Sequence, residues 1–406
     1  MSGAQPTHAQ RAGGAPGLMR GAPPFGDGLV TLANWQDPPY NRWAFQHVRD
    51  LIPTARIRRG SFVRELPVAP CDVGALSFRH GSRRMTVEEM LEETFTDGFL
   101  VLHRGRIRFE RYLNQMLPDT RHLLMSVSKS VVATVAGLLA SGGRLDVSAP
   151  LTSIVSELRG TSFDGATVQQ LLDMRTGTRF NEEYDDLDAD VRTYEPIYLW
   201  RPDDGRPRPA DILSYYPTLV NDGEHGGPFR YRSILTDVLG WVLERAADHR
   251  LSELVSELIW QPMGAEYDAE VTVDAHGNAM ADGGVCATLR DLARFGALYL
   301  SGSPLPAAWI ADTARGAPDG AQAFSAGDGR PDWPPGGHYR NCWWVRDPTA
   351  PFLVAAGIYG QNIYVLPADD LVIAKFSTWP SALEPALGQL TLAAVQSIAA
   401  HLREGA

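Results

Sequence analysis

The sequence predicts an α/β protein in which an antiparallel sheet is built from both ends of the chain and flanked by helices. An inserted, mainly helical region is expected between those ends. Two observations lead to this fold class. Strand-like apolar patterns with hairpin signatures occur at residues 98–112 and again at 359–377, whereas the segments between them carry helix-period apolar positions. The sheet must therefore combine chain segments that are far apart in sequence.

Both sheet regions are predicted to be hairpins. Residues 98–105 and 106–112 indicate two strands joined by a tight turn, and residues 359–367 and 371–377 indicate two more, linked by Ala-Asp-Asp. Turn-forming residues between two apolar runs are typical of antiparallel neighbours.

The helices are predicted from apolar periodicity and end signals. Residues 126–139 are apolar almost all round and stop at Gly142-Gly143, which indicates a buried helix with a glycine end. Thr288-Leu-Arg-Asp291 forms a capping-box sequence that begins a helix running to about residue 300. The other expected helices cover residues 167–174, 233–246 and 383–402, the last with Pro385 in its first turn.

Composition divides the chain into an N-terminal arm and one large domain. Residues 1–32 are rich in Gly, Pro and Ala and are expected to form a flexible arm. The domain at 33–406 would have an α/β part at about 33–150 and 270–406 and a helical part at about 150–270. Two long segments rich in Gly, Pro and Asp, at 201–230 and 313–341, are expected to be lids or disordered loops.

Charge and cysteine content exclude several classes of protein. The net charge of −11 argues against nucleic acid or an anionic membrane as a partner, and no apolar run has transmembrane length. The N-terminus lacks the pattern of a signal peptide. Cys71, Cys286 and Cys342 fit no zinc spacing, and the ten histidines form no metal-ligand pattern. We therefore expect a cytoplasmic protein that uses neither a metal nor another cofactor.

The strongest chemical signal is Ser126-Val-Ser-Lys129, because Lys129 and Lys375 are the only lysines among 406 residues. Arginine cannot give up its proton in a protein, whereas a desolvated lysine can. On a helix, positions i and i+3 share a face, so the Lys129 amine can reach the Ser126 hydroxyl and activate it as a nucleophile. The alternative is a chance match with a surface lysine, which the apolar flanking residues disfavour.

This role requires Lys129 to be neutral near pH 7. Its pKa would have to fall from about 10.4 by roughly three units, at a cost of about 4 kcal/mol. Burial on an apolar helix favours the neutral amine, so we expect a lowered pKa at Lys129.

Two further segments complete an acyl-transfer site. Tyr231-Arg-Ser233 precedes an apolar helix, and Tyr231 beside a neutral lysine can carry the serine proton to a leaving group. The segment Gly357-Ile-Tyr-Gly360 indicates a strand whose backbone a substrate can approach, so that an amide there and the Ser126 amide could stabilise an oxyanion. The alternatives are a core tyrosine and a pair of β-bulge glycines. The chain contains no G-x-S-x-G elbow, H-E-x-x-H, Walker A or dinucleotide-binding motif.

With these elements in this order, the chain resembles the serine β-lactamase and penicillin-recognising superfamily. Within it, the likeness is greatest to the 6-aminohexanoate-dimer hydrolases (nylon-oligomer hydrolases) and related carboxylesterases, and it spans about residues 34–395. The runs that carry it are Trp35-Gln-Asp-Pro-Pro, Asn41-Arg-Trp-Ala-Phe45, Arg121 to Ser130, Thr236-Asp-Val-Leu-Gly-Trp241, Asp291-Leu-Ala-Arg294 and Gly357 to Asn362.

The resemblance implies a β-lactamase-like fold and a homodimer, and it assigns roles to individual residues. Ser126 would be the acylated nucleophile, Lys129 its base and Tyr231 the proton shuttle, with the amides of Ser126 and Ile358 forming the oxyanion hole. Four residues would bind substrate: Tyr184, Glu195, Asp282 and Trp344. Tyr184 matches a tyrosine on a mobile loop that contacts the scissile amide, and Trp344 matches a tryptophan that closes over the substrate.

Departures from the superfamily narrow the predicted function. Ala356-Gly-Ile-Tyr-Gly360 replaces the usual lysine- or histidine-containing triad that grips the carboxylate of a β-lactam, and Tyr231-Arg-Ser233 replaces Tyr-x-Asn. We therefore expect a serine hydrolase that cleaves linear amides or short-chain esters. Glu195 and Asp282 would attract a substrate amine, unless both are simply solvated loop carboxylates. The alternatives are a carboxylesterase or D-amino-acid peptidase with little nylon-oligomer activity, and a binding protein without turnover.

Overall fold

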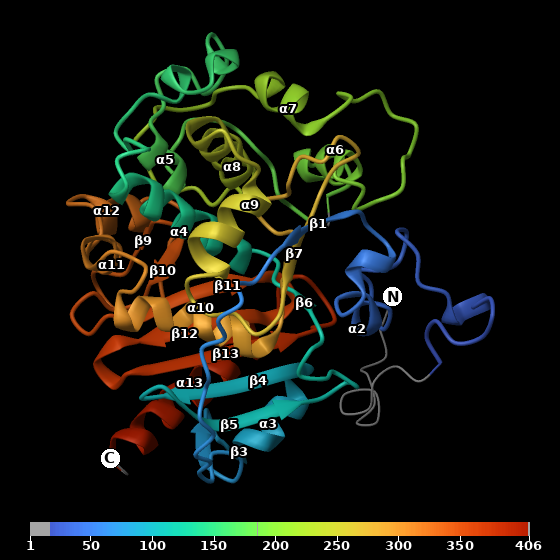
Figure 1. Ribbon diagram of the computed structural model, residues 1–406, viewed down its shortest axis with the longest axis vertical. Coiled ribbons are helices and arrows are strands. Elements are labelled where there is room, and N and C mark those ends of the chain that lie inside the picture. The colour runs from blue at the N-terminus through green and yellow to red at the C-terminus, as the bar shows by residue number, and fades with distance from the viewer. Residues whose placement is uncertain (1–16, 185, 405–406) are drawn as a thin grey trace.

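The computed structural model describes residues 17–184 and 186–404 of the chain. Its main feature is a seven-stranded sheet in which every neighbouring pair is antiparallel (Figure 1). The strand order is β5 (Arg106–Tyr112), β4 (Thr96–His103), β13 (Leu371–Ser377), β12 (Gln361–Leu366), β11 (Leu353–Gly357), β10 (Trp343–Val345) and β9 (His338–Arg340). The two predicted hairpins lie side by side in this sheet because β4 pairs with β13. The predicted sheet built from both chain ends is therefore confirmed.

The turns of the hairpins follow from their residues. Arg104 and Gly105 both have positive φ, at 52° and 69°, which matches the turns that suit the right-handed twist of a hairpin. Between β12 and β13, Asp370 takes the left-handed conformation at φ 46°. Every residue of β4 and of β13 is buried, which places both strands in the interior of the sheet.

A smaller four-stranded sheet was not predicted. It consists of β1 (Thr54–Ile57), β7 (Ala269–Thr272), β8 (Val285–Ala287) and β6 (His122–Leu123). These strands contain only two to four residues each, too few for a period-two pattern to be recognised. A separate hairpin pairs β2 (Ser77–His80) with β3 (Arg83–Thr86).

The predicted helices are confirmed to within a few residues. They are α4 (Val127–Ser141), α5 (Val168–Leu172), α8 (Ile234–Ala247), α10 (Leu289–Ser301) and α13 (Pro385–Glu404). The Thr288 hydroxyl caps α10 by accepting from the Asp291 amide. The other helices are α2 (Asn41–Ala44), α3 (Val87–Glu93), α6 (Asp190–Ile197), α7 (Ile212–Tyr215), α9 (Leu251–Val255), α11 (Ala307–Arg315) and α12 (Gly320–Ser325).

The helices fall into two groups, one gathered beyond an edge of the large sheet and one packed on its face. Figure 1 shows α5 to α9 gathered at one end of the molecule, with the large sheet below them. Helix α10 lies directly on β12 and β13, since a Cβ atom at Gly296 would come within 2.6 Å of Val372 and 3.0 Å of Ile363. Helix α4 lies where the first group meets the large sheet and contacts both α8 and β11. No helix in the described part of the chain is long and apolar enough to cross a membrane.

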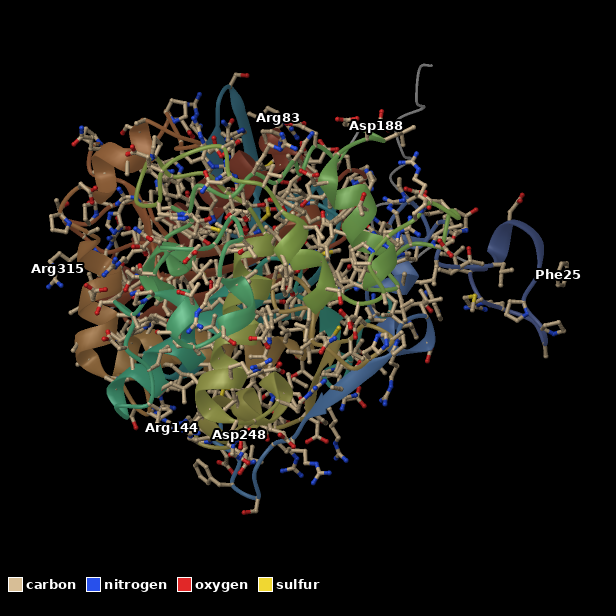
Figure 2. All side chains as sticks on the ribbon, turned by 90° about the horizontal axis from the view of Figure 1, so that it is seen from above. Phe25, Arg83, Arg144, Asp188, Asp248 and Arg315 are labelled. Carbon is tan, nitrogen blue, oxygen red and sulfur yellow. The ribbon has the colours of Figure 1, made fainter. Side chains whose placement is uncertain are left out.

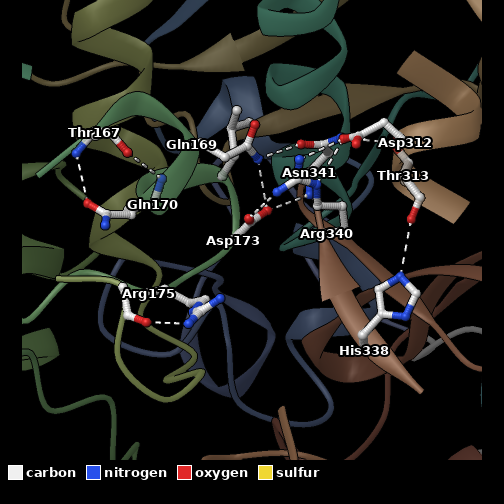
Figure 3. A network of polar contacts seen from close by, with 12 residues as sticks. Thr167, Gln169, Gln170, Asp173, Arg175, Asp312, Thr313, His338, Arg340 and Asn341 are labelled. Carbon is white, nitrogen blue, oxygen red and sulfur yellow. Dashed lines mark hydrogen bonds and ion pairs between the residues drawn. The ribbon is translucent and has the colours of Figure 1, made fainter. Parts of the chain in front are cut away.

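The two segments expected to be long loops contain regular structure. Residues 201–230 include α7, and residues 313–341 include the end of α11, all of α12 and β9. These elements are short and interrupted by Gly and Pro, so the composition hid them. Figure 3 shows why the second segment is ordered: Arg340 and Asn341 bond to Asp173, and Arg340 also pairs with Asp312 of α11.

Residues 1–16 of the predicted flexible arm lie outside the described residues. Residues 17–32 form a closed loop, because the Met19 amide donates to the Gly28 carbonyl at 2.8 Å and the Val30 amide donates to the Met19 sulfur. Figure 2 shows this loop projecting from the body of the protein, with Phe25 far out on it. The Phe25 side chain is 80% exposed.

Candidate active site

Ser126 lies where the helices meet the large sheet, between β6 and α4. Strand β6 ends at Leu123, and the Leu124 amide then donates to the Val285 carbonyl of β8. Met125 takes a positive φ of 48°, uncommon for a residue with a side chain, and this turns the chain into α4 with Ser126 at its N-cap. The nucleophile is thus held by a constrained turn between a strand and a buried helix, a conformation that clusters at functional sites.

The predicted pair of Ser126 and Lys129 is formed. Lys129 is completely buried, and its Nζ atom lies 2.8 Å from the Ser126 Oγ. The same Nζ donates to the Asp282 backbone carbonyl at 2.9 Å and lies 3.4 Å from the Asp282 carboxylate. The Lys129 Nζ therefore makes one contact with Ser126 and two contacts with Asp282.

The expectation of a lowered pKa at Lys129 is wrong. Burial is the largest single effect and acts to lower the pKa, but the nearby acidic groups, chiefly the Asp282 carboxylate, outweigh it and hold the pKa above its usual value. Sequence reasoning weighed the apolar helix and missed the acidic groups, because they come from distant segments. The resting lysine is charged.

Lys375, rather than Lys129, has a lowered pKa. Burial lowers the pKa of Lys375 to about 7, with a partial opposing effect from Asp97. Lys375 is completely buried in β13, and its Nζ contacts the Ser377 hydroxyl. A lysine can remain there as a neutral amine, whereas an arginine would bring an obligatory charge.

Tyr231 lies next to the Ser126–Lys129 pair. The Lys129 Nζ lies 5.3 Å from the centroid of the Tyr231 ring, and the Ser126 hydroxyl interacts with the Tyr231 hydroxyl. Burial raises the pKa of Tyr231, while Lys129 and Ser126 act to lower it, and the net result is a raised value. The Tyr231 backbone is fixed by a 3.0 Å hydrogen bond from its amide to Asp328. Both members of the Lys129–Tyr231 pair are therefore protonated at neutral pH.

The predicted oxyanion segment lies against the nucleophile. A Cβ atom built on Gly357 would come within 2.8 Å of the Leu124 carbonyl, 2.9 Å of the Met125 Cβ and 3.0 Å of the Ser126 amide nitrogen. Only glycine permits this approach, which places the end of β11 and the following residue Ile358 beside the Ser126 amide. Ile358 lines the same pocket as Ser126.

A small pocket opens at Ser126 and contains most of the predicted substrate-binding residues. Its lining includes Tyr184, Glu195, Asp282 and Ile358. The cavity measures about 30 Å³, enough for about one water molecule and far too small for an amide substrate. A larger groove of about 680 Å³ lies along β5 and contains none of the predicted catalytic residues.

The carboxylates of Glu195 and Asp282 are already paired within the protein. Glu195 accepts hydrogen bonds from Arg192 at 2.8 Å and from Arg201 at 2.5 Å. Asp282 faces Lys129. Both residues line the pocket, but their ion pairs leave little charge to attract a substrate amine.

Trp344 has a different contact from the one expected. Its ring stacks on the Tyr231 ring, with centroids 5.4 Å apart and planes 20° from parallel, and it is not among the residues that line the pocket. The predicted closure of Trp344 over a substrate stays a prediction.

Sequence reasoning missed three residues at the site. Glu182 lines the pocket, accepts a 2.9 Å hydrogen bond from the Ser233 amide and has a pKa that burial raises to about 7. Tyr194, which also lines the pocket, and Asp237, which does not, both bond to Asp282. The only sequence signals were the position of Glu182 in Asn181-Glu-Glu-Tyr184 and that of Asp237 in Thr236-Asp-Val-Leu-Gly-Trp241, both within runs already linked to the site.

A serine in contact with a buried lysine, a tyrosine against this pair and the glycine end of a strand beside the serine amide define a serine hydrolase of the Ser-x-x-Lys type. The chain belongs to the beta-lactamase family, whose family model matches residues 85–396. The β-lactamase-like fold implied by the resemblance is therefore confirmed.

Two proteins of similar sequence and one solved structure are similar to this chain. The chain is 38% identical over 372 residues, 90% of each chain, to a 6-aminohexanoate-dimer hydrolase of Paenarthrobacter ureafaciens. It is 31% identical over 164 residues, 37% of this chain and 38% of the relative, to the esterase EstB of Burkholderia gladioli. Among solved structures, a Bacillus anthracis protein described as a candidate 6-aminohexanoate-dimer hydrolase superposes with a TM-score of 0.85 at 26% identity, covering 93% of this chain and 98% of that one.

Proposed function

We propose that this chain hydrolyses linear amides and short-chain esters through an acyl-enzyme on Ser126. The observation that carries the proposal is the 2.8 Å contact between the Lys129 Nζ and the Ser126 Oγ within a pocket that also contains Ile358. The similarity to a 6-aminohexanoate-dimer hydrolase over 90% of the chain and to an esterase over a shorter region supports both substrate classes.

The chemistry begins with the loss of one proton from the Lys129–Tyr231 pair, because both groups are protonated at rest. The deprotonated pair then accepts the Ser126 hydroxyl proton as Oγ forms a bond to the carbonyl carbon. The amides of Ser126 and Ile358 donate to the carbonyl oxygen as it becomes negative. Tyr231 returns the proton to the leaving nitrogen or oxygen as its bond to the acyl carbon breaks. A water molecule, deprotonated by the same pair, releases the acid and regenerates Ser126.

Turnover of p-nitrophenyl acetate by Ser126→Ala and Lys129→Arg tests this proposal. We expect both variants to lose at least about 10³-fold in kcat, since each removes one member of a unit that acts together. Lys129→Arg is the sharper variant because arginine keeps the positive charge and cannot act as a base. Unchanged turnover in Ser126→Ala would reject the acyl-enzyme.

For substrates that carry an amine, the geometry favours Glu182 over the two carboxylates predicted from the sequence. Glu182 lines the pocket and forms no ion pair with any described residue, whereas Glu195 is held by two arginines. We propose that Glu182 attracts the free amine of a linear substrate such as a 6-aminohexanoate dimer. Equal activity on this dimer and its N-acetylated form would contradict an anionic amine site.

Tyr184 is proposed to contact the scissile amide after the pocket opens. Its half-buried side chain lines the pocket, where burial and the nearby Glu182 hold its pKa well above the usual value, so that the phenol remains a hydrogen-bond donor. The cytoplasmic location and the homodimer stay predictions.

A further inference from the structure

A chain of polar groups leads from Lys129 into the core between α6, α8 and the segment that carries Asp282. Asp282 occupies two of the three bonding positions of the Lys129 Nζ, through its backbone carbonyl at 2.9 Å and its Oδ2 at 3.4 Å. In a neutral lysine these two positions would use both N–H groups, and the lone pair would point at the Ser126 Oγ. The placement of Asp282 therefore determines where the base directs its lone pair.

Asp282 is itself held from two sides. The Tyr194 hydroxyl lies 2.8 Å from the Asp282 Oδ1, and the Asp282 amide donates to the Asp237 Oδ1 at 3.0 Å. Asp237 extends from α8 and Tyr194 from α6, and both side chains are almost completely buried. Hydrogen bonds to α6 and α8 thus hold Asp282, whose carboxylate faces Lys129.

The Tyr194 hydroxyl is in contact with two carboxyl groups and has only one hydrogen. It lies 2.5 Å from the Asp237 Oδ2 and 2.8 Å from the Asp282 Oδ1. A phenol can donate to one of these oxygens only, so the second contact requires a proton on a carboxyl group. Two ionised carboxylates sharing a buried site would also repel each other strongly.

The surroundings identify which carboxyl group carries this proton. Asp282 faces the Lys129 cation, whereas Asp237 forms no ion pair within the described residues. Burial, followed by the charge of Asp282, holds the pKa of Asp237 well above its usual range. The chain of donors then runs from Asp237 to Tyr194, from Tyr194 to the Asp282 Oδ1, and from Lys129 to the Asp282 Oδ2.

We propose that Asp237 carries a proton at neutral pH and, through Tyr194, positions Asp282 so that Lys129 is aimed at Ser126. Asp237 and Tyr194 are positioning residues, since neither touches the serine. The proposal rests on the proposed function for its kinetic consequence, but the protonation of Asp237 can be measured without any turnover.

Tyr194→Phe removes the bridging hydroxyl and leaves the ring. The matched control is Tyr198→Phe, at the residue that directly follows α6, because Tyr198 is equally buried but bonds to Tyr216 and to the Ala279 carbonyl instead. We expect Tyr194→Phe to lower kcat on p-nitrophenyl acetate about tenfold or more with little change in KM, while Tyr198→Phe stays within about threefold of wild type. Equal kcat values in the two variants would overturn the positioning role.

Infrared spectroscopy tests the proton directly. The carboxylic-acid C=O absorption of the wild-type protein at pH 7, to which Glu182 also contributes, should lose the component due to Asp237 in Asp237→Asn, and a spectrum with no difference in that absorption would overturn the proposal. Asparagine can still accept from the Asp282 amide and donate to Tyr194, so Asp237→Asn should keep kcat within about threefold, whereas Asp237→Ala should lose about tenfold or more. A loss in Asp237→Asn as large as that in Asp237→Ala would contradict the protonated state. Failure of the proposed function would instead appear as wild-type turnover that survives Ser126→Ala, whatever the infrared result.

Discussion

Gly357→Ala is predicted to disable the oxyanion site while leaving the nucleophile and its base in place. The added Cβ would lie 2.8 Å from the Leu124 carbonyl, 2.9 Å from the Met125 Cβ and 3.0 Å from the Ser126 amide nitrogen. These contacts are about 0.4 to 0.6 Å inside the 3.4 Å at which ordinary van der Waals contact begins. None of the three atoms is the end of a flexible side chain, so β11 must move away from Ser126.

A shift of this size matters because a catalytic group needs to be placed to within about 0.5 Å. The Ile358 amide would move with the strand and lose most of its hydrogen bond to the oxyanion. Loss of one such donor costs about 10²-fold in kcat, which corresponds to about 2.7 kcal/mol of transition-state stabilisation. Binding of the ground-state ester depends less on this amide, so KM should change little.

The assay is the steady-state hydrolysis of p-nitrophenyl acetate, with the melting temperature measured alongside to show that the variant is folded. Gly388→Ala is the matched control, because a Cβ at Gly388 makes only an ordinary 3.6 Å contact with Trp379 and lies in α13. A folded Gly357→Ala variant whose kcat stays within about threefold of wild type would refute the assignment of this strand to the oxyanion site.

Three other predictions concern charge. The Lys129–Tyr231 pair must lose a proton and the pKa values of both groups are raised, so kcat/KM should still be rising above pH 8. Asp282→Asn removes a group that raises the pKa of Lys129 and should therefore move this rise to lower pH. A plateau of kcat/KM by about pH 6 would contradict the charged resting lysine. Glu182→Gln should raise KM about tenfold for an amine-bearing amide at pH 8, where a carboxyl group with a pKa of about 7 is ionised, and leave the KM for p-nitrophenyl acetate unchanged; an equal change in KM for both substrates would argue against amine recognition. Lys375→Met should leave kcat unchanged and raise the free energy of unfolding by on the order of 1 kcal/mol at pH 7. Because the folded state lowers the pKa of Lys375, this gain in stability should shrink as the pH rises toward 10. Urea unfolding at both pH values measures the gain, and a gain that does not depend on pH would contradict this reasoning.

The sequence was sufficient to predict the two central hairpins of the large sheet and the proximity of Ser126 and Lys129. Residues 98–112 and 359–377 have alternating or continuous apolar runs with short turns, and local patterns of this kind determine a hairpin almost by themselves. Ser126 and Lys129 are three residues apart on one helix, so helix geometry alone brings them together.

What the sequence could not predict depends on contacts between distant segments. The pKa of Lys129 depends on burial and on the acidic groups Asp282 and Glu182, whose proximity no local pattern reveals. The pairing of Glu195 with Arg192 and Arg201 likewise depends on how α6 ends against the pocket. The small sheet containing β6 was missed because strands of two to four residues carry too short a pattern, although this sheet places Ser126.

The proposed acyl-enzyme can be tested most directly by mass spectrometry of the intact protein after exposure to a serine-directed fluorophosphonate. The structure predicts one adduct, located on Ser126 by peptide mapping, absent from Ser126→Ala and formed far more slowly in Lys129→Arg. Labelling of another residue, or equal labelling of Lys129→Arg and wild type, would contradict a nucleophile activated by the buried lysine.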